Sequence, residues 1–313
     1  MTSPIVVTTD RPKHLNRYIV AILLLAVTFR IYAVLSHPTT PSGDAADYHR
    51  LATGLVHGLG YINSAGRATA WRPPAYPLFL AATYKILGVN VLRVTIVQAL
   101  LGAVTVLLLI ALASLLLDWR TALVAGLVAA VYPAFIWLPC VLLSENLSIF
   151  LLLLTLIAIV LYLRTSRITW ILVFGAICGL SSLVRSTNLS LPIAVVLGVV
   201  IIRWRSRSVN WNQLVEPILI MTLAFVLTLT PWAIRNYRVF HQLIPVATQD
   251  GLTLYGSYWP PQRNGKLIWG TLPGTEDPAI VAATTIGDEA SASRFLRQLT
   301  QQRLREHPGF FLG

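Results

Sequence analysis

Charged residues are scarce in this sequence: they make up 12% of its 313 residues, whereas hydrophobic residues make up 56%. A chain with so few charges lacks the polar surface of a water-soluble globular protein, and its apolar content is typical of a bilayer protein. The scarcity of charge therefore excludes a soluble protein and predicts a multi-pass helical membrane protein.

Cysteine is also nearly absent. The two cysteines, Cys140 and Cys178, fall in different apolar segments, which excludes a disulfide framework and gives no metal-binding spacing. No small-x-small cleavage site follows the first apolar run, so this run is interpreted as a retained signal anchor. No internal repeat and no low-complexity tract is found.

The formal net charge of +12 raises the question of nucleic acid binding. The Lys and Arg residues form no dense basic arm beside stacking aromatics, so no nucleic acid partner is expected. Instead they separate apolar runs, as the positive-inside rule requires. Arg11, Lys13 and Arg17 precede the first run and place the N-terminus in the cytoplasm.

The apolar runs predict an all-α multi-pass membrane protein with about seven transmembrane helices. These are residues 18–35, 91–117, 121–140, 147–163, 170–184, 189–202 and 213–232. The further apolar run 76–88 would rise only about 20 Å, too little for a hydrocarbon core of roughly 30 Å. With seven spans the arginine clusters fall inside and Glu145, Arg185 and Arg235 fall outside.

We expect two regions along the chain. Residues 1–240 form the transmembrane module, with a first external loop at residues 36–90. Residues 241–313 hold most of the remaining acidic residues and several Gly and Pro breaks, which indicates an extracytoplasmic segment. The last residues, 307–313, resemble the start of another membrane helix, so we expect the chain to be truncated there.

The first external loop is too polar for the bilayer core. A helix from Asp44 to Leu59 would place Tyr48, Leu51 and Leu55 on one side, with polar residues on the other. Such a helix is expected to lie in the membrane interface with its apolar face toward lipid.

On this topology, carboxylates and arginines meet at the outer membrane boundary. They are Asp44, Asp47, Glu145, Arg72, Arg185 and Arg235. Arginine binds phosphate through a planar fork of donors, and a carboxylate takes a proton from a hydroxyl or holds a cation. This combination suits a substrate with an anionic head and an apolar tail.

Simpler interpretations stay open for each of these residues. Asp44 is alternatively the N-cap of the interfacial helix, and Asp47 the partner of Arg50 at i+3. Ser144 is alternatively a cap with Glu145 in the first helical turn. Arg72 and Arg235 are alternatively ligands of ordinary lipid phosphates. Near the outer end of the first span, Arg30 either snorkels or pairs with an acidic residue in a cleft.

Four short motifs occur in order along the chain. They are GDAADY at 43–48, WRPPAYP at 71–77, LSENL at 143–147 and PWAIRNY at 231–237. Their order resembles the C-type glycosyltransferases that use polyprenyl-phosphate sugars, family 39 in particular. Its relatives include the protein O-mannosyltransferases and the bacterial aminoarabinose lipid-A transferases.

The resemblance implies an integral membrane glycosyltransferase that takes a sugar from a polyprenyl phosphate and transfers it, with inversion, on the extracytoplasmic face. It maps the acidic residue that acts at the reacting centre onto Asp44, whose carboxylate would be the general base. It maps the second acidic position onto Glu145. The substrate-binding positions would be Tyr48, Asp47, Arg72 and Arg235, with Arg72 on the donor phosphate. It leaves open a divalent cation, although no metal ligands are assigned.

The sequence leaves the sugar and the acceptor open, and the acceptor is a protein, a lipid or a glycan. Two other functions remain: a transporter or flippase for a lipid-linked substrate, and a non-catalytic binding partner. A transporter is expected to show charges buried at mid-depth, broken helices or paired repeats. The ionisable residues cluster at helix ends, which favours the enzyme.

Overall fold

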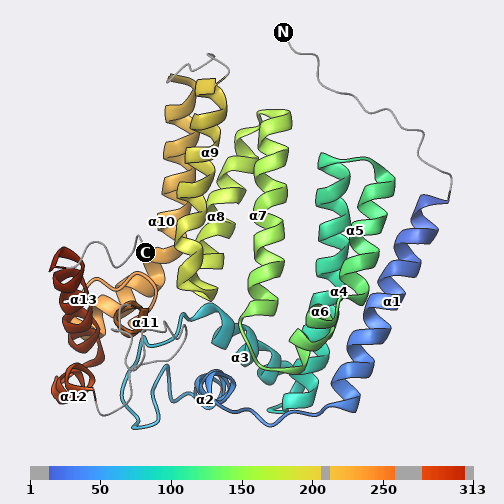
Figure 1. The fold of residues 1–313 in the computed structure, drawn as a ribbon. Helices are drawn as coiled ribbons and strands as arrows, with labels where there is room; N and C mark the ends of the chain where they lie inside the picture. Colours follow the sequence, from blue (N-terminus) through green and yellow to red (C-terminus); the bar gives the residue numbers. More distant parts are fainter. Residues whose placement is uncertain (1–13, 206–211, 258–276, 307–313) are drawn as a thin grey trace. The chain divides into compact units, whose positions relative to one another are not determined.

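The computed structural model describes residues 14–205, 212–257 and 277–306 (Figure 1). Over these ranges the chain is helical, with one isolated antiparallel bridge between Ile62 and Ala68 and no strand. The predicted all-α class is therefore confirmed. The basic residues Arg11 and Lys13 and the predicted helix entrance at 307–313 lie outside the described residues.

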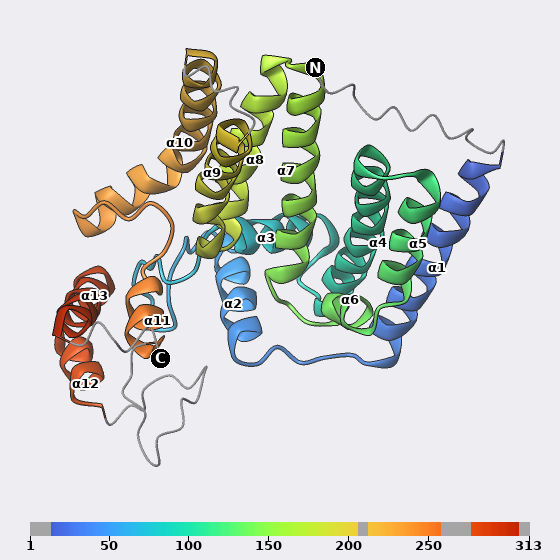
Figure 2. The same ribbon diagram turned by 45° about the horizontal axis from the view of Figure 1, so that its top comes forward.

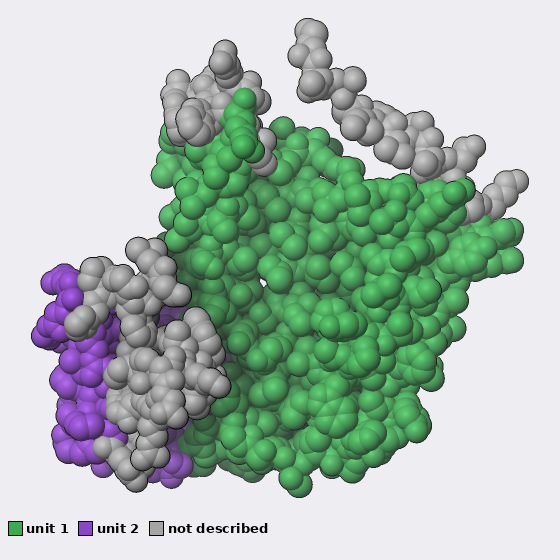
Figure 3. Space-filling model, viewed as in Figure 1, with its two compact units in different colours: residues 1–60, 75–229 green, residues 61–74, 230–313 purple. Residues whose placement is uncertain are grey.

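The chain divides into two compact units, coloured separately in Figure 3. The first consists of residues 1–60 and 75–229, and the second of residues 61–74 and 230–313. The second unit thus combines part of the predicted first loop with the C-terminal region. The domain boundary expected at residue 240 stays a prediction.

The first unit is a helical bundle (Figures 1 and 2). Helices α1, α4, α5, α7 and α8 run alternately down and up in Figure 1, and α2 is seen nearly end-on below them. Its elements are α1 (Leu15–Ser36), α2 (Asp44–Val56), α3 (Ala75–Leu87), α4 (Val91–Leu116), α5 (Trp119–Val131), α6 (Pro133–Trp137), η1 (Leu138–Cys140), α7 (Glu145–Thr165), α8 (Ile168–Val184), η2 (Ser186–Ser190), α9 (Leu191–Arg205) and the first part of α10 (Asn212–Phe240).

Four described helices are long and apolar enough to cross a membrane. They are α1, α4, α7 and residues Val215–Phe240 of α10. A bent pair, Trp119–Val131 with Pro133–Cys140, would make a fifth, and the helices Ile168–Val184 and Ser186–Ile201 are shorter apolar helices. The multi-pass membrane class is confirmed, whereas the count of seven spans stays a prediction.

The span predicted for residues 121–140 is not one continuous helix in the structure. Helix α5 ends at Val131, and α6 begins at Pro133 after a bend of 57°. Proline has no N–H, so it cannot donate to the carbonyl four residues earlier, that of Ala129. Tyr132 adopts an extended conformation (φ −66°, ψ 120°), as residues before proline prefer.

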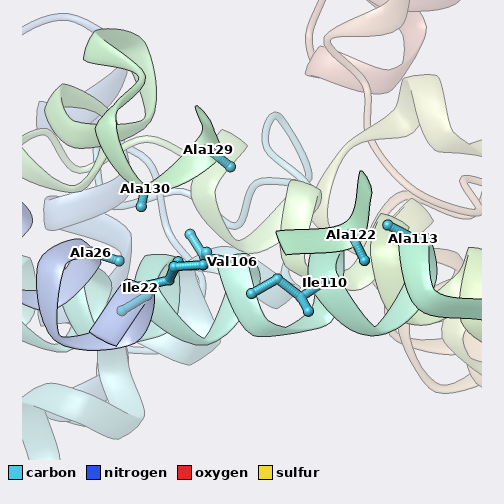
Figure 4. Close-up of a cluster of buried hydrophobic side chains, with 9 residues drawn as sticks. Ile22, Ala26, Val106, Ile110, Ala113, Ala122, Ala129 and Ala130 are labelled. Carbon is cyan, nitrogen blue, oxygen red and sulfur yellow. The ribbon is translucent and has the colours of Figure 1, made fainter. Parts of the chain in front are cut away.

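Small residues let the helices of the first unit approach closely. Figure 4 shows the alanines of α1, α4 and α5 gathered around Ile22, Val106 and Ile110. In α8, Gly175 and Gly179 form a GxxxG pattern. A Cβ on Gly179 would come 2.7 Å from Cβ of Thr228, and one on Gly175 would overlap the carbonyl of Met221. Glycine is therefore required at both positions for this packing.

Helix α2 is shorter than predicted and ends at Val56. Its apolar residues Tyr48, Leu51 and Ala52 are buried, and α2 packs against α3. The expectation that this face contacts lipid is therefore wrong. The amphipathic pattern is confirmed, but a helix of the same chain, α3, covers the apolar face.

The second unit contains the end of α10 together with α11 (Asp250–Ser257), α12 (Pro278–Thr285) and α13 (Glu289–Glu306). Two small cores stabilise it. One joins Ala70 and Ile244 to Ala290, and the other surrounds the buried ring of Tyr255. The first of these cores connects the loop 61–74 to segments more than 150 residues later in the chain.

Candidate functional site

The candidate site in the first unit begins at the turn before α2. Gly43 is the N-cap residue, with φ 51° and ψ −125°, a conformation that is open to glycine and strained for other residues. Asp44 is the first helical residue and is exposed, so the alternative interpretation of Asp44 as the N-cap is wrong. The glycine instead sets the direction in which α2, and with it Asp44, leaves the turn.

Asp47 forms the ion pair predicted from its spacing. The Arg50 Nη2 atom donates to Asp47 Oδ1 at 2.8 Å, and both side chains are about one-third exposed. An i,i+3 pair of this kind stabilises a helix by roughly 0.2–0.5 kcal/mol. At least one oxygen of Asp47 therefore serves the helix itself.

Tyr48 connects α2 to the start of α7. Tyr48 lies one helical turn after Asp44, so the two residues share a face of α2. The buried Tyr48 hydroxyl donates to Ser144 Oγ at 3.4 Å. Ser144 occupies the N-cap position of α7, but its side chain makes no capping hydrogen bond. The predicted capping role of Ser144 is therefore wrong, since its hydroxyl contacts the neighbouring elements.

Glu145 is the first residue of α7, where a carboxylate is favoured by the helix dipole. Its Oε1 atom forms an ion pair with Arg185, which follows α8, and Arg185 Nη1 also lies 3.4 Å from Ser144 Oγ. The Glu145 side chain is 40% exposed as a whole, but its second carboxylate oxygen, Oε2, is buried and has no hydrogen-bond partner among the described residues. A buried carboxylate oxygen without a donor is costly unless another molecule supplies one.

Two residues that the sequence did not single out complete this site. The buried Tyr76 ring lies edge-on against Tyr48, with centroids 4.8 Å apart, and its hydroxyl donates to Gln98 Oε1 at 2.7 Å. Burial, followed by the nearby Tyr48, Tyr84 and Glu145, raises the pKa of Tyr76 well above its ordinary value. Tyr76 is therefore a neutral donor. A glutamine within an apolar span signals a buried polar contact, but it does not identify Tyr76 as the partner.

The two predicted phosphate-binding arginines belong to the second unit. Arg72 is buried and donates to Gln249 Oε1 at 3.0 Å. Arg235 donates to the carbonyls of Thr69 at 2.7 Å and Tyr61 at 3.1 Å, and its guanidinium lies 4.9 Å from the Trp232 ring centroid. Arg235 thus holds the loop that contains Arg72.

No group of three or more His, Cys, Asp or Glu side chains suited to a metal ion occurs in the described part of the chain. In the first unit Asp47 pairs with Arg50 and Glu145 with Arg185, each through one carboxylate oxygen. The divalent cation that the sequence left open stays a prediction, and the chemistry proposed below includes no step that depends on one.

A bundle of apolar helices with carboxylates and arginines at helix ends defines an integral membrane protein with a polar site at one end of its first unit. The family model described as dolichyl-phosphate-mannose-protein mannosyltransferase matches residues 71–234, more than half of the chain. The chain belongs to this family, and it is a membrane glycosyltransferase of the mannosyltransferase type. The comparison with curated proteins found no match.

Proposed function

We propose that this protein transfers a sugar from a polyprenyl-phosphate donor to an acceptor hydroxyl on the extracytoplasmic face of a cell membrane. The family name supports the class of donor. The observation that argues most for the site is the buried Oε2 atom of Glu145, which has no hydrogen-bond partner in the part of the chain that the structure describes. It belongs to the helix start that Tyr48 connects to the helix of Asp44.

In the proposed reaction, Asp44 removes the proton of the acceptor hydroxyl. The acceptor oxygen then forms a bond to the anomeric carbon as the bond to the phosphate oxygen breaks, and polyprenyl phosphate leaves with the bonding electrons. Attack opposite the leaving group inverts the anomeric carbon. Asp44 is suited to this role because it is the exposed first residue of α2, whose apolar face is buried.

Glu145 has a different proposed role, since its Oε1 atom is paired with Arg185. Its Oε2 atom would accept a hydrogen bond from a hydroxyl of the sugar or of the acceptor. Tyr48, beside it, would line the same site, and Asp47 would orient the substrate while paired with Arg50.

Replacement of the carboxylates tests this proposal. Asp44→Asn and Glu145→Gln are expected to lower the rate of transfer from polyprenyl-phosphate mannose by about 10²- to 10⁴-fold, the usual contribution of general acid–base groups. The rate is measured by mass spectrometry of the polyprenyl phosphate released in membranes. Asp118→Asn is the matched control, because Asp118 caps α5 and asparagine caps equally well. Full activity of Asp44→Asn would remove the proposed base.

For the donor phosphate, Arg72 is the proposed ligand and Arg235 a second contact that mainly holds the loop 61–74. Lipids that co-purify with the wild-type protein and with Arg72→Ala should differ. We expect a polyprenyl phosphate or its glycosylated form in the wild type and its depletion in the variant. Bulk phospholipid alone in both samples would argue against Arg72 as the phosphate ligand.

Two observations favour a transporter or flippase of the same lipid-linked substrate as the second candidate. Arg30 is buried in α1, and α5 and α6 form a broken helix, both of which are features expected of transporters. In proteoliposomes with polyprenyl-phosphate mannose, a flippase moves the lipid between leaflets without releasing polyprenyl phosphate. This alternative would be supported if the wild type transfers no sugar and the Asp44→Asn variant still moves the lipid between leaflets.

A further inference from the structure

A second polar system lies deeper in the first unit and is not explained by the proposed reaction. Its central residue is Arg30, in α1, of which only 1% is exposed. The expectation that Arg30 snorkels is wrong, and so is the alternative of an acidic partner. Its Nη1 atom donates to the carbonyls of Ala26 and Ala130, and its Nη2 atom to that of Ala129, each at 3.1 Å.

The carbonyls of Ala129 and Ala130 belong to the last turn of α5, directly before the break. The last four carbonyls of a helix lack intrahelical donors, and Pro133 supplies no N–H to Ala129. Inside an apolar bundle such groups are costly when unpaired. Arg30 therefore caps the broken helix from a neighbouring helix, and its positive charge faces the negative end of the α5 dipole.

Gln98 holds the other side of the same break. This fully buried side chain of α4 uses both Nε2 hydrogens to donate to the carbonyls of Pro139 and Val141, each at 3.0 Å. Its Oε1 atom accepts from Tyr76, and its carbonyl accepts from Asn146 Nδ2 at 2.8 Å. The segment that leads from η1 to Glu145 is thus fixed at three points by one residue.

The two buried side chains also require space beside α4. A Cβ on Gly102 would lie 3.1 Å from Arg30 Nε and 3.4 Å from Asn146 Oδ1. A cavity of about 90 Å³ lies at this point, and Arg30 Nε is buried without a partner among the described residues. Gly102 therefore leaves room for Arg30 directly beside the helix that begins with Glu145.

We propose that Arg30 and Gln98 are positioning residues that fix the broken segment Pro133–Val141 and thereby the position of Glu145 at the start of α7. Arg30 stabilises the helix end before the break, and Gln98 stabilises the turn after it. The role of Glu145 in catalysis rests on the proposed function, whereas the fixing of the segment does not.

The two native cysteines allow a direct test. Cys140 is buried in η1, within the broken segment, and Cys178 is buried in the core shared by α7, α8 and α10. Modification of both thiols by N-ethylmaleimide is followed by peptide mass spectrometry in the full chain. Cys140 reports on the segment, and Cys178 reports on the bundle as a whole.

The variants are Arg30→Met, which removes the three donated hydrogen bonds, and Gln98→Glu, which keeps the shape and the acceptor but removes the two donors. We expect Cys140 to react about tenfold faster in each variant while Cys178 stays protected, because local opening needs less free energy than global unfolding. Thr105→Val is the matched control. Thr105 lines the same cavity but donates only within α4, to Leu101.

Continued protection of Cys140 in both variants would overturn the proposal, and so would equal exposure of both thiols, which would indicate global unfolding. Activity gives a separate readout. In Gln98→Glu, kcat for transfer is expected to fall about tenfold with the donor KM changed less than twofold. Arg30→Lys should restore Cys140 protection in part, since an ammonium still donates to carbonyls. A tenfold increase in Cys140 reactivity with unchanged kcat would show that Arg30 and Gln98 fix the segment but would overturn the claim that the segment positions Glu145 for transfer.

Discussion

Two glutamates occupy the same local position in the two units. Glu145 is the first residue of α7, and Glu289 is the first residue of α13. In the second unit both Glu289 oxygens accept hydrogen bonds: Oε2 from Thr69 Oγ1 at 2.7 Å, and Oε1 from Thr248 Oγ1 at 3.2 Å and from the amide of Ala70. In the first unit Glu145 Oε1 pairs with Arg185 and Oε2 has no described partner.

This difference distinguishes a carboxylate that is used within the protein from one that is available to another molecule. A carboxylate whose oxygens are all bonded to its own protein ties segments together, as Glu289 ties the loop 61–74 to α13. A carboxylate with an unpartnered buried oxygen keeps the ability to accept a hydrogen bond from another molecule. Position at a helix start therefore does not distinguish the two glutamates, whereas the completeness of their hydrogen bonding does.

The largest expected effect is the loss of transfer activity on replacing Glu145. Glu145→Gln should lower the transfer rate by 10²-fold or more, about 2.7 kcal/mol of activation free energy, while the midpoint of thermal unfolding changes little. An equal loss of activity and stability would show that Glu145 is structural, like Glu289.

Glu289→Gln should show the opposite pattern. The amide keeps one acceptor but loses the charge and places an NH₂ group where the carboxylate oxygen accepted, so we expect a loss of about 1.5–3 kcal/mol in unfolding free energy. Limited proteolysis of the loop 61–74 measures this loss. Proteolysis unchanged from the wild type would contradict the assignment of Glu289 as the tie.

Smaller effects are expected from replacing one glycine in each of the two units. Gly43→Ala should cost about 1–3 kcal/mol because φ 51° with ψ −125° is strained for alanine, and it should reduce activity because α2 contains Asp44. Gly251→Ala should also destabilise by about 1–3 kcal/mol, since its Cβ would overlap the backbone of Ser293 in the second unit.

Activity separates these two variants. Activity per folded molecule should fall for Gly43→Ala and should not fall for Gly251→Ala. Unchanged activity in Gly43→Ala would mean that the turn does not orient Asp44.

The sequence predicted what depends on neighbours along the chain. The i,i+3 spacing predicted the pair of Asp47 and Arg50, and the order of the motifs predicted the family. The predictions for Arg30 were wrong, because an arginine at a given depth of a helix points to lipid or to protein according to which helices pack around it. The break at Pro133 was visible as a proline, but the apolar run on both sides favoured one continuous span.

The contacts of Gln98 and Tyr76 were beyond sequence reasoning for a related reason. They join residues 22 positions apart through the packing of α3 on α4, which periodicity within one helix does not determine. The same holds for the packing of Arg235, which the resemblance assigned to the substrate. Its guanidinium donates to two carbonyls of a loop about 170 residues away, and its role as a phosphate contact stays a prediction.

The smallest expected effect is a difference in the pH dependence of the two units. In the first unit, burial lowers the pKa of His49 below its ordinary value of 6.5, and His49 Nδ1 lies 2.7 Å from the Tyr84 hydroxyl of α3. The unfolded chain therefore binds a proton that the folded chain does not. The contribution of the neutral His49 to the packing of α2 on α3 is complete above pH 6.5 and is lost as the pH falls from this value through the lower pKa of the folded state.

In the second unit, the pKa of Asp288 is affected first by burial, which raises it, but hydrogen bonds from Ser291 and Ala290 prevail and lower it below 3.8. Its stabilising contribution is present above pH 3.8 and is lost only below that value. Hydrogen exchange at pH 7.0 and pH 5.0 should thus show faster exchange in α2 at pH 5.0, after correction for intrinsic rates, with α13 unchanged. His49→Gln should remove the change in α2. An equal increase in the exchange of α13 at pH 5.0 would reject the assignment of this transition to His49. The pKa of Asp288 is below 3.8, so Asp288 does not change its charge between pH 7.0 and pH 5.0.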